Sequence, residues 1–273
     1  MLTDSHNHTC HFSPDAKTTI DELIMTASSL CIPRVAVTEH YELDNPDPED
    51  DIGIFDLDSY LNTFGEWKKK CPAGLELLMG IEFGYRKEIA SRLDDIADSY
   101  PFDTVILSNH MFYDRDVYFN RDIVYSLPVK ERQKIYIGRM AEMADRMNGY
   151  DIIAHYDYIN KYNPEVSESV MYDDSPKEFD DLFEVIISKA KALEINTSYY
   201  AERKTAGDRN VLPDEKLIRR YLEMGGRLIS IGSDSHSKEA LSQHFKEVSE
   251  YLKFCGIKEV VYFSKRRPYT EGL

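Results

Sequence analysis

Cysteine is scarce in this sequence of 273 residues, and long apolar runs are absent from it. The four cysteines are scattered and form no C-x-x-C pair of the kind found in zinc and redox sites. No stretch is long and apolar enough to span a bilayer, and the first residues lack the pattern of a secretory signal peptide. We therefore expect a cytoplasmic protein with reduced thiols and no membrane partner.

Positive charge is also in short supply. The sequence has 33 lysines and arginines against 49 aspartates and glutamates, which gives a formal net charge of −16 at pH 7. A surface field of this sign repels nucleic acid and anionic membranes, so we expect neither as a partner. An anionic substrate would have to be held by cations gathered locally.

Internal repeats and low-complexity segments are absent as well, and the length suits one domain over residues 1–273. Short apolar runs rich in β-branched residues alternate with longer stretches of helical periodicity. After an initial strand from Leu2, we expect strands at 34–38, 75–81, 104–107, 151–154, 193–196 and 228–231. Helices are expected at 20–30, 57–70, 87–99, 129–147, 176–192, 213–225 and 237–256.

Two segments stand apart from this alternation. Residues 111–127 are aromatic and polar with no clear period, which predicts a lid or the wall of a pocket. Residues 260–263 form one more apolar run, which either closes the sheet or lies outside it.

The alternation indicates a parallel sheet with crossover helices, either a closed barrel or an open doubly wound sheet. Polar residues decide between the two, because histidines and carboxylates follow the ends of six expected strands. These residues are His6 with His8, His40, Glu82, His110, His155, and Asp234 with His236. In a barrel such ends surround one mouth, whereas opposite edges of an open sheet hold them too far apart. We predict an α/β fold, a TIM-like barrel of about seven strands with a site at their C-terminal ends.

The H-x-H motif at His6 and His8 stands where the first strand gives way to a loop. Alternate side chains of an extended segment share a face, so both imidazoles can reach one point, as two metal ligands must. The alternative is a solvated pair at a frayed terminus, and any one of the other histidines can instead be buried against a backbone carbonyl. Six of the eight histidines stand at strand ends, which favours a metal site.

The mixture of imidazoles with glutamate and aspartate, with no cysteine nearby, suits Zn²⁺, Mn²⁺ or Fe²⁺ rather than an all-oxygen Mg²⁺ or Ca²⁺ site. The candidate ligands are too many for one tetrahedral ion. Two or three divalent ions that share bridging carboxylates would use them all.

Eight short motifs lie in order along the chain: H-N-H at 6–8, S-P-D-A at 13–16, T-E-H at 38–40, G-I-E-F at 80–83, S-N-H at 108–110, A-H at 154–155, L-E-I-N-T-S at 193–198 and G-S-D-S-H at 232–236. Together they resemble the motif series of the PHP (polymerase and histidinol phosphatase) superfamily. Within it, Asp15 and L-E-I-N-T-S resemble the histidinol-phosphate phosphatase branch, since many other members carry a histidine where this chain has Asp15. The resemblance implies a distorted (β/α)7 barrel that holds three metal ions.

Carried over position by position, the resemblance assigns nine metal ligands. It puts His6, His8, Glu82 and Asp234 on a first metal, with Glu82 bridging to a second that His110 and His155 complete. Asp15, His40 and His236 would hold the third. Glu39, beside His40, is either a carboxylate that orients an imidazole or a strand-end group in solvent.

For the activity, the resemblance implies a hydrolase of phosphoric monoesters, with L-histidinol phosphate as the first substrate to test. Clustered dications lower the pKa of a bound water towards about 7 and stabilise the attacking and leaving oxygens together. We expect a metal-bridging hydroxide to attack phosphorus, without a side-chain nucleophile. Two alternatives remain open: another phosphoester as substrate, such as a nucleotide, a sugar phosphate or a phosphotyrosyl peptide, and a non-catalytic metal-binding module.

The phosphate group of such a substrate needs positive charge beyond the metals, and Lys161 and Arg203 follow strand ends on the expected mouth side. Lys204 and Arg209 are rivals, and for each of these residues a solvated surface position is equally compatible with the sequence. The amine and imidazole of histidinol phosphate call for acidic and aromatic partners. The loop at 41–56 and the segment at 111–125 supply candidates, namely Glu42, Asp44, Asp47, Phe112, Tyr113 and Tyr118.

Overall fold

A computed structural model describes residues 1–47, 52–163, 170–198 and 212–273 of the chain. Within these residues, six parallel strands form one curled sheet in the order β1-β2-β3-β6-β7-β8. Their bounds are β1 (Arg34–Tyr41), β2 (Glu76–Gly84), β3 (Thr104–Ser108), β6 (Ile152–Ile153), β7 (Ala192–Asn196) and β8 (Ile229–Gly232). The strands near the middle of the chain are almost wholly buried, as expected for a parallel sheet covered by helices.

The first residues of the chain complete the sheet between its two edges. Asp4 forms an isolated parallel bridge with Val35 of β1, and Asn7 forms one with Ser235, just after β8. The backbone amide of Ser5 donates to the carbonyl of Ile231 at 3.1 Å, which ties the same segment to β8. The expected strand from Leu2 is therefore an extended segment held by a few bonds. With it in this place, the sheet forms the predicted distorted TIM-like barrel.

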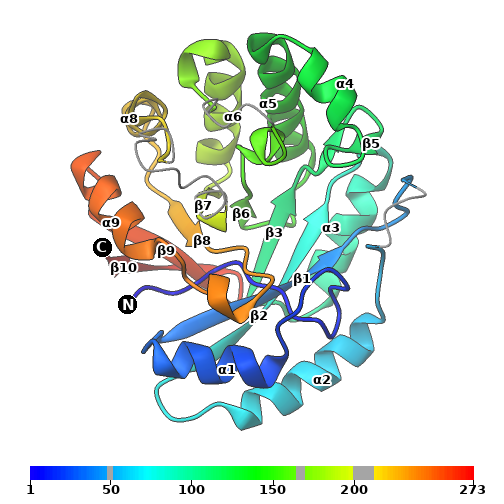
Figure 1. Cartoon of the computed structure of the whole chain (residues 1–273), viewed down its shortest axis with the longest axis vertical. Helices are drawn as coiled ribbons and strands as arrows, with labels where there is room; N and C mark the ends of the chain where they lie inside the picture. The colour runs from blue at the N-terminus through cyan, green and yellow to red at the C-terminus, as the bar shows by residue number, and fades with distance from the viewer. Residues whose placement is uncertain (48–51, 164–169, 199–211) are drawn as a thin grey trace.

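Helices surround the sheet, as Figure 1 shows. They are α1 (Ile20–Ser29), α2 (Leu57–Lys70), α3 (Ala90–Ser99), α5 (Val129–Arg146), α6 (Pro176–Ser188), α8 (Glu215–Glu223) and α9 (Phe245–Phe254). The start of α1 is fixed by the capping box that the sequence contains, in which Thr19 and Glu22 cap each other's backbone amides. Its apolar face, from Ile20 to Ala27, is buried in the main hydrophobic core. In the described parts of the chain, no helix is both long and apolar enough to cross a bilayer.

The last helix begins later than the sequence pattern predicts. The pattern predicts a helix from Ser237, but the chain forms a short 3₁₀ turn, η5 (Lys238–Ala240), and α9 starts only at Phe245. Ser242 explains the interruption, because its amide and hydroxyl both donate to the buried carboxylate of Asp4 at 2.9 Å. Ser242 and His244 also have positive φ angles, of 51° and 60°, which a continuous right-handed helix does not allow. Tertiary bonds to Asp4 thus override the local helical pattern.

The aromatic segment after β3 folds into small elements rather than one loop. It contains the antiparallel hairpin β4 (Met111–Phe112) and β5 (Arg115–Asp116), followed by α4 (Arg121–Ser126). Further short 3₁₀ turns are η1 (Lys87–Ile89), η2 (Tyr158–Asn160) and η3 (Tyr172–Asp174).

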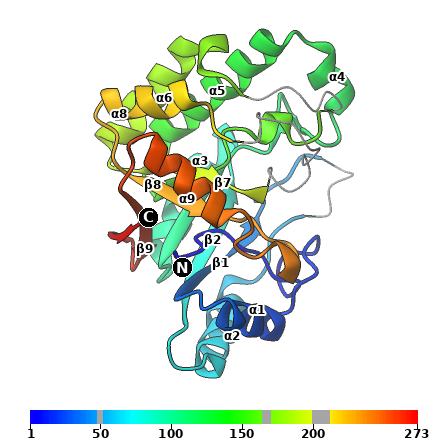
Figure 2. The ribbon, with the colours of Figure 1, turned by 60° about the vertical axis from the view of Figure 1, so that its left-hand side comes forward.

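The C-terminal hairpin closes the end of the barrel where the strands begin. It consists of β9 (Glu259–Ser264) and β10 (Arg267–Gly272), which pair antiparallel outside the parallel sheet. Val261 and Phe263 pack against Ile106 and Ile152, and the turn residue Arg266 forms an ion pair with Asp151 just before β6. Figure 2, like Figure 1, shows the two termini close together. The run at 260–263 therefore lies outside the parallel sheet. The hairpin that contains it covers the end of the barrel where the strands begin and forms the floor of the barrel.

Candidate metal centre

Glu82 lies at the middle of the cluster formed by the predicted metal ligands. It is fully buried near the end of β2, and the parallel register places it beside His40 of β1. Its Oε2 lies 2.7 Å from Nδ1 of His40, 3.4 Å from Nε2 of His6 and 3.5 Å from Nε2 of His8. Its Oε1 lies 3.0 Å from Nε2 of His155 and 3.3 Å from Nε2 of His110. One carboxylate thus contacts five imidazoles, a bridging position.

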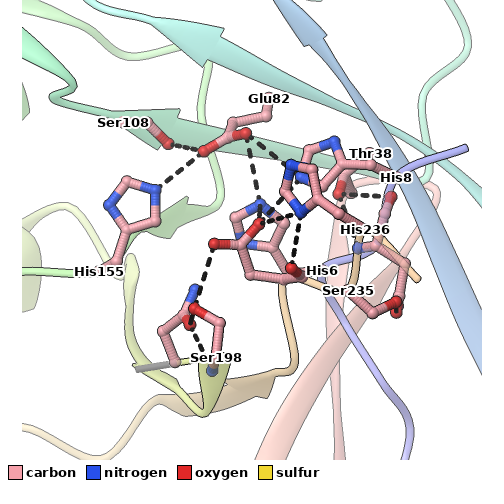
Figure 3. Close-up of polar contacts among 12 residues, drawn as sticks. His6, His8, Thr38, Glu82, Ser108, His155, Ser198, Ser235 and His236 are labelled. Atoms are coloured by element: carbon pink, nitrogen blue, oxygen red, sulfur yellow. Dashed lines mark hydrogen bonds and ion pairs between the residues drawn. The ribbon is translucent and has the colours of Figure 1, made fainter. Parts of the chain in front are cut away.

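Figure 3 shows how this arrangement is built. Glu82 extends from its strand between His155 on one side and the imidazoles of His6, His8 and His236 on the other. The hydroxyl of Ser108, at the end of β3, donates to the same oxygen that His155 approaches. Side chains from the ends of β2, β3, β6 and β8 and from the N-terminal segment therefore converge at one mouth of the barrel, as the sequence predicted.

The converging side chains form overlapping groups whose ligand atoms lie within 4.8 Å of one another. The groups are His6, His8 and Asp234; Glu82, His110 and His155; His8, His40 and His236; and His40, Glu42 and His110. Asp15 joins the third group, with its Oδ2 2.9 Å from Nε2 of His236 and 3.5 Å from Nε2 of His40. All nine residues predicted as ligands are brought together. His11, in contrast, is exposed and packs beside Trp67.

Several buried ligand atoms at the centre form no hydrogen bond of standard geometry among the described residues, although charged neighbours lie close to them. They are Nε2 of His6 and His8, Nδ1 of His40 and Oε2 of Glu82, all buried. Leaving such atoms unpaired costs about 1–3 kcal/mol each, and more for charged groups. Divalent cations bound in the cluster would give these atoms partners, and imidazole and carboxylate are suitable ligands for first-row ions. The residues present therefore fit a metal cluster.

Without metal, protonated imidazoles neutralise the buried carboxylates of the cluster. Burial works to raise the pKa of Glu82, but the charges of His6, His40 and His110 outweigh it and keep that pKa well below its ordinary value. Burial works to lower the pKa of His40, but Glu82 and Asp15 outweigh it and raise the pKa to about 10. The pKa values of His6 and His110 are likewise raised by neighbouring carboxylates against the effect of burial. A cation that binds here must displace these protons.

Two carboxylates that the sequence analysis did not assign to the metal site contact ligand imidazoles at the ring nitrogen that does not face Glu82. Oε1 of Glu194 lies 2.7 Å from Nδ1 of His6, and its Oε2 accepts the backbone amide of His155 at 2.8 Å. Oε1 of Glu42 lies 2.7 Å from Nδ1 of His110. Such partners fix the tautomer and orientation of a ligand histidine. The available signal for Glu194 was a charged residue inside a buried strand, which requires a polar partner.

Glu39 supports the loop that carries the first ligands. It is fully buried, so it is not a strand-end group in solvent, and burial raises its pKa to about 7. Its carboxylate accepts hydrogen bonds from the amide and hydroxyl of Thr9 and from the hydroxyl of Ser13. The Ser13 hydroxyl in turn lies 3.4 Å from Nδ1 of His8. Glu39 therefore acts on a ligand imidazole through Ser13.

A cavity of about 260 Å³ opens beside the cluster. Its lining combines ligand residues with Lys161, Asp116 and four aromatic side chains: Tyr118, Phe119, Tyr158 and Tyr162. The ammonium of Lys161 lies 3.9 Å from Oδ2 of Asp234 and 5.2 Å from the ring centre of Tyr158. The cavity thus places a cation next to the metal cluster and aromatic surface further out. Arg203, Lys204 and Arg209 lie outside the described residues.

Most of the residues expected to receive the amine and imidazole of the substrate are engaged elsewhere. Asp44 pairs with Arg92 at the surface, Asp47 pairs with Arg115, and Glu42 holds His110. Phe112 belongs to the core, and Tyr113 lines a different cavity. Of the six candidates, Tyr118 and Glu42 line the cavity beside the cluster. Composition alone could not show which side of the loop each residue faces.

Asp116 is a cavity residue that the sequence analysis missed. It is buried at the end of β5 and accepts the backbone amide of Tyr118 at 2.7 Å and the hydroxyl of Tyr158 at 3.2 Å. It therefore places a carboxylate among the aromatic residues of the cavity wall. A hairpin with no clear sequence period positions it, so its direction was not readable in advance.

Comparison with known proteins gives related sequences over almost the whole chain. The PHP domain family matches residues 4–198. A protein named probable histidinol-phosphatase from Clostridium acetobutylicum is 30% identical over 266 residues, which cover 97% of this chain and 98% of that protein. The histidinol-phosphatase of Lactococcus lactis subsp. lactis is 27% identical over 264 residues, which cover 96% of this chain and 94% of that protein.

The fold is also that of a solved structure. A crystal structure of histidinol phosphate phosphatase from Lactococcus lactis subsp. lactis, complexed with zinc, L-histidinol and phosphate, aligns with a TM-score of 0.83. The two chains are 24% identical, and the alignment covers 98% of this chain and 100% of the other. By its sequence motifs, its barrel and these relatives, the chain belongs to the PHP domain family.

Proposed function

We propose that this chain is a metal-dependent phosphomonoesterase that hydrolyses L-histidinol phosphate to L-histidinol and phosphate, with residues 1–273 acting as one domain. The observation that carries the proposal is the cluster of five imidazoles around the buried carboxylate of Glu82. The relatives named histidinol-phosphatase, which match along nearly the full chain, support the choice of substrate.

For the metal site, we assign the nine clustered residues to two or three divalent ions, with zinc, manganese and iron as candidates. His6, His8, Glu82 and Asp234 would hold the first ion, and His110 and His155 would hold a second that Glu82 bridges. Asp15, His40 and His236 would hold a third. Bound divalent ions supply a water of lowered pKa and neutralise phosphoryl oxygens as charge develops. Two of the four groups of ligand atoms, His6 with His8 and Asp234 and Glu82 with His110 and His155, support the first two sites. For the third, Asp15 lies 2.9 Å from Nε2 of His236 and 3.5 Å from Nε2 of His40.

The chain's own residues orient and bind the substrate around this centre. Glu194 and Glu42 hold Nδ1 of His6 and of His110, so that Nε2 of each imidazole faces Glu82. Lys161 provides a point charge for the phosphate, at the rim of the cluster next to Asp234. Arg203 remains a prediction for the same role.

The leaving group would lie along the aromatic wall of the cavity. Asp116 and the ring of Tyr118 offer a carboxylate and an aromatic face to the amine and imidazole of histidinol. A cationic amine gains from both a carboxylate and aromatic rings. This end of the cavity would therefore select the alcohol that leaves, while the cluster and Lys161 bind the phosphate common to all monoesters.

A substrate panel tests the proposal. Phosphate release from L-histidinol phosphate is compared with release from nucleotides, sugar phosphates and a phosphotyrosyl peptide, using metal-loaded protein. The His8→Ala, Asp234→Ala double variant is the blank. Strong preference for histidinol phosphate that the variant loses is the expected result. Preference for another ester would overturn the substrate, and absence of turnover on every ester would leave a metal-binding module.

A further inference from the structure

A second cavity lies against the end of β2, beside α5 and the β4–β5 hairpin. Its volume is about 550 Å³, and its lining includes Tyr85, Arg86, Tyr113 and Arg139. None of these four lines the cavity beside the metal cluster. The second cavity is therefore a separate feature, although Tyr85 follows Glu82 by only three positions in the chain.

Three hydrogen-bond donors in this lining have no acceptor among the described residues. They are the hydroxyl of Tyr85, Nη1 of Arg86 and Nε of Arg139, and all three atoms are buried. Tyr85 as a whole is 2% exposed. Unpaired buried donors are rare in folded proteins because each forfeits its hydration without replacement. An acceptor bound among these side chains would provide the missing partners.

The charges around the cavity indicate what kind of acceptor fits. Burial raises the pKa of Tyr85 to about 12, so its hydroxyl keeps its proton near neutral pH and can donate. The nearest carboxylate on α5, Glu142, is held by Arg146 at 2.9 Å and by Lys87 at 3.6 Å. Glu88, whose side chain is 70% exposed, lies 4.0 Å from Nη2 of Arg86, and Asp114 also lines the cavity. The buried donor atoms without an acceptor among the described residues belong to two guanidinium groups and a hydroxyl.

We propose that this cavity binds a small oxyanion, a phosphate or carboxylate group, through Arg86, Arg139 and Tyr85. Guanidinium groups present paired donors that match the oxygens of either group, and the bond gains strength because both partners are charged. The lining carries three basic residues, Arg86, Lys87 and Arg139, against the carboxylates of Glu88, Asp114 and Glu142. The two half-buried arginines therefore favour an anion through buried donor atoms that lack an acceptor among the described residues, and not through an excess of charge. The proposal is independent of the activity at the metal cluster.

The site is connected to the metal cavity through one hairpin. Nη1 of Arg139 donates to the backbone carbonyl of Tyr113 at 2.8 Å, at the turn between β4 and β5. Tyr113 holds a φ of 57°, in the left-handed region that a bulky residue seldom adopts. The same hairpin ends at Asp116, which lines the metal cavity. An anion bound to Arg139 would therefore lie against the element that positions Asp116.

Phosphate stoichiometry tests this proposal. Equilibrium dialysis of metal-loaded protein against radiolabelled inorganic phosphate counts the ions bound per chain. We expect Arg86→Met and Arg139→Met each to weaken one phosphate site at least about tenfold, because each removes a charged donor. Tyr85→Phe keeps the ring and removes the hydroxyl, so it should weaken the same site by a smaller factor. Malonate in place of phosphate tells whether a carboxylate is also accepted.

Control variants separate this site from the metal cluster. Arg219→Met removes an arginine of α8 that pairs with Glu215 outside the cavity lining, and it should keep the wild-type count. The His8→Ala, Asp234→Ala double variant should retain this phosphate even if it loses any phosphate bound at the cluster. Equal phosphate binding by wild type, Arg86→Met, Arg139→Met and Tyr85→Phe would overturn the proposal, and so would loss of all phosphate binding in the double variant alone.

Discussion

At the scale of single residues, the site depends on carboxylates that serve two different purposes. Glu82 faces the centre of the cluster, where its two oxygens are shared among five imidazoles. Glu194 lies on the other side of His6 and contacts Nδ1, the ring nitrogen that does not face Glu82. In the proposed assignment, the first carboxylate binds metal, whereas the second fixes the tautomer of a ligand.

Replacing Glu194 with glutamine should weaken metal binding without removing a ligand. The amide keeps the shape of the side chain but cannot hold Nδ1 of His6 as a charged acceptor, so we expect metal affinity to fall about 10–100-fold. Competition of the protein with a chromophoric chelator measures the affinity. Glu76→Gln, at an exposed carboxylate of β2, is the matched control and should leave it unchanged. An unchanged affinity in Glu194→Gln would contradict the positioning role.

Metal binding should release protons near neutral pH. The pKa values of His6, His40 and His110 are raised in the metal-free protein, so these imidazoles carry protons at pH 7, and a metal ligand must be deprotonated. Apparent metal affinity should therefore rise as the pH is raised from about 6 to 8 and fall as it is lowered. Calorimetry of Zn²⁺ binding in two buffers with different heats of ionisation counts the protons. Identical heats in both buffers would rule out this account.

At the scale of elements, the ends of the strands pack the ligands tightly against one another. Gly232, the last residue of β8, has no side chain, and a Cβ there would lie 2.5 Å from Oε1 of Glu194 and 2.5 Å from Cβ of His6. A larger residue would have to displace the pair that holds the first ligand. The glycine in the G-S-D-S-H motif is therefore explained by close approach of two strands and not by a turn.

Gly232→Ala should destabilise both the fold and the metal site. Overpacking of this kind costs about 1–3 kcal/mol of the free energy of unfolding. Gly65→Ala provides the matched control, because Gly65 lies in α2, where a methyl group would have open space for 4 Å around it, and alanine should stabilise the helix by about 0.5–1 kcal/mol. Urea denaturation of metal-free and metal-loaded protein measures both changes. Equal effects of the two substitutions would show that the approach at β8 is not tight.

The elements also show how far the sequence carries a prediction. The alternation of apolar runs identified all six strands of the sheet, and the strand ends identified eight of the nine clustered residues, because burial and parallel topology leave a local pattern. Asp15 was assigned only through the resemblance to the PHP motif series. Glu194 and Asp116 were missed because their roles depend on which neighbours the fold brings beside them. The start of α9 was misplaced because Asp4, more than 200 positions earlier, captures Ser242. Local pattern does not contain such bonds.

At the scale of the whole molecule, the two ends of the barrel have separate tasks. The mouth at the C-terminal ends of the strands is polar and carries the ligand cluster, while the opposite end is closed by the C-terminal hairpin. The chain termini meet near this floor, where the amide of Thr3 donates to Glu271 at 2.6 Å. The floor therefore contributes stability, and the mouth holds the proposed metal site.

Phe263→Ala should separate these tasks. Phe263 is 3% exposed and packs inside the floor, so its removal should cost about 3–5 kcal/mol of the free energy of unfolding. Metal affinity of the folded protein should stay at the wild-type value, because the ligands lie at the other end of the barrel. Phe254→Ala, at a side chain that is 65% exposed, is the control for both measurements. Loss of metal affinity in parallel with stability would show that floor and mouth are coupled.

The most direct test of the proposed metal-dependent phosphatase activity is to return metal to the metal-free protein while phosphate release from L-histidinol phosphate is recorded. We predict that turnover is absent after chelation, reappears with two or three equivalents of Zn²⁺ per chain, and stays absent in Glu82→Gln, which removes the charge that the five imidazoles surround. Wild-type turnover that persists without metal, or turnover by Glu82→Gln equal to that of wild type, would contradict the claim.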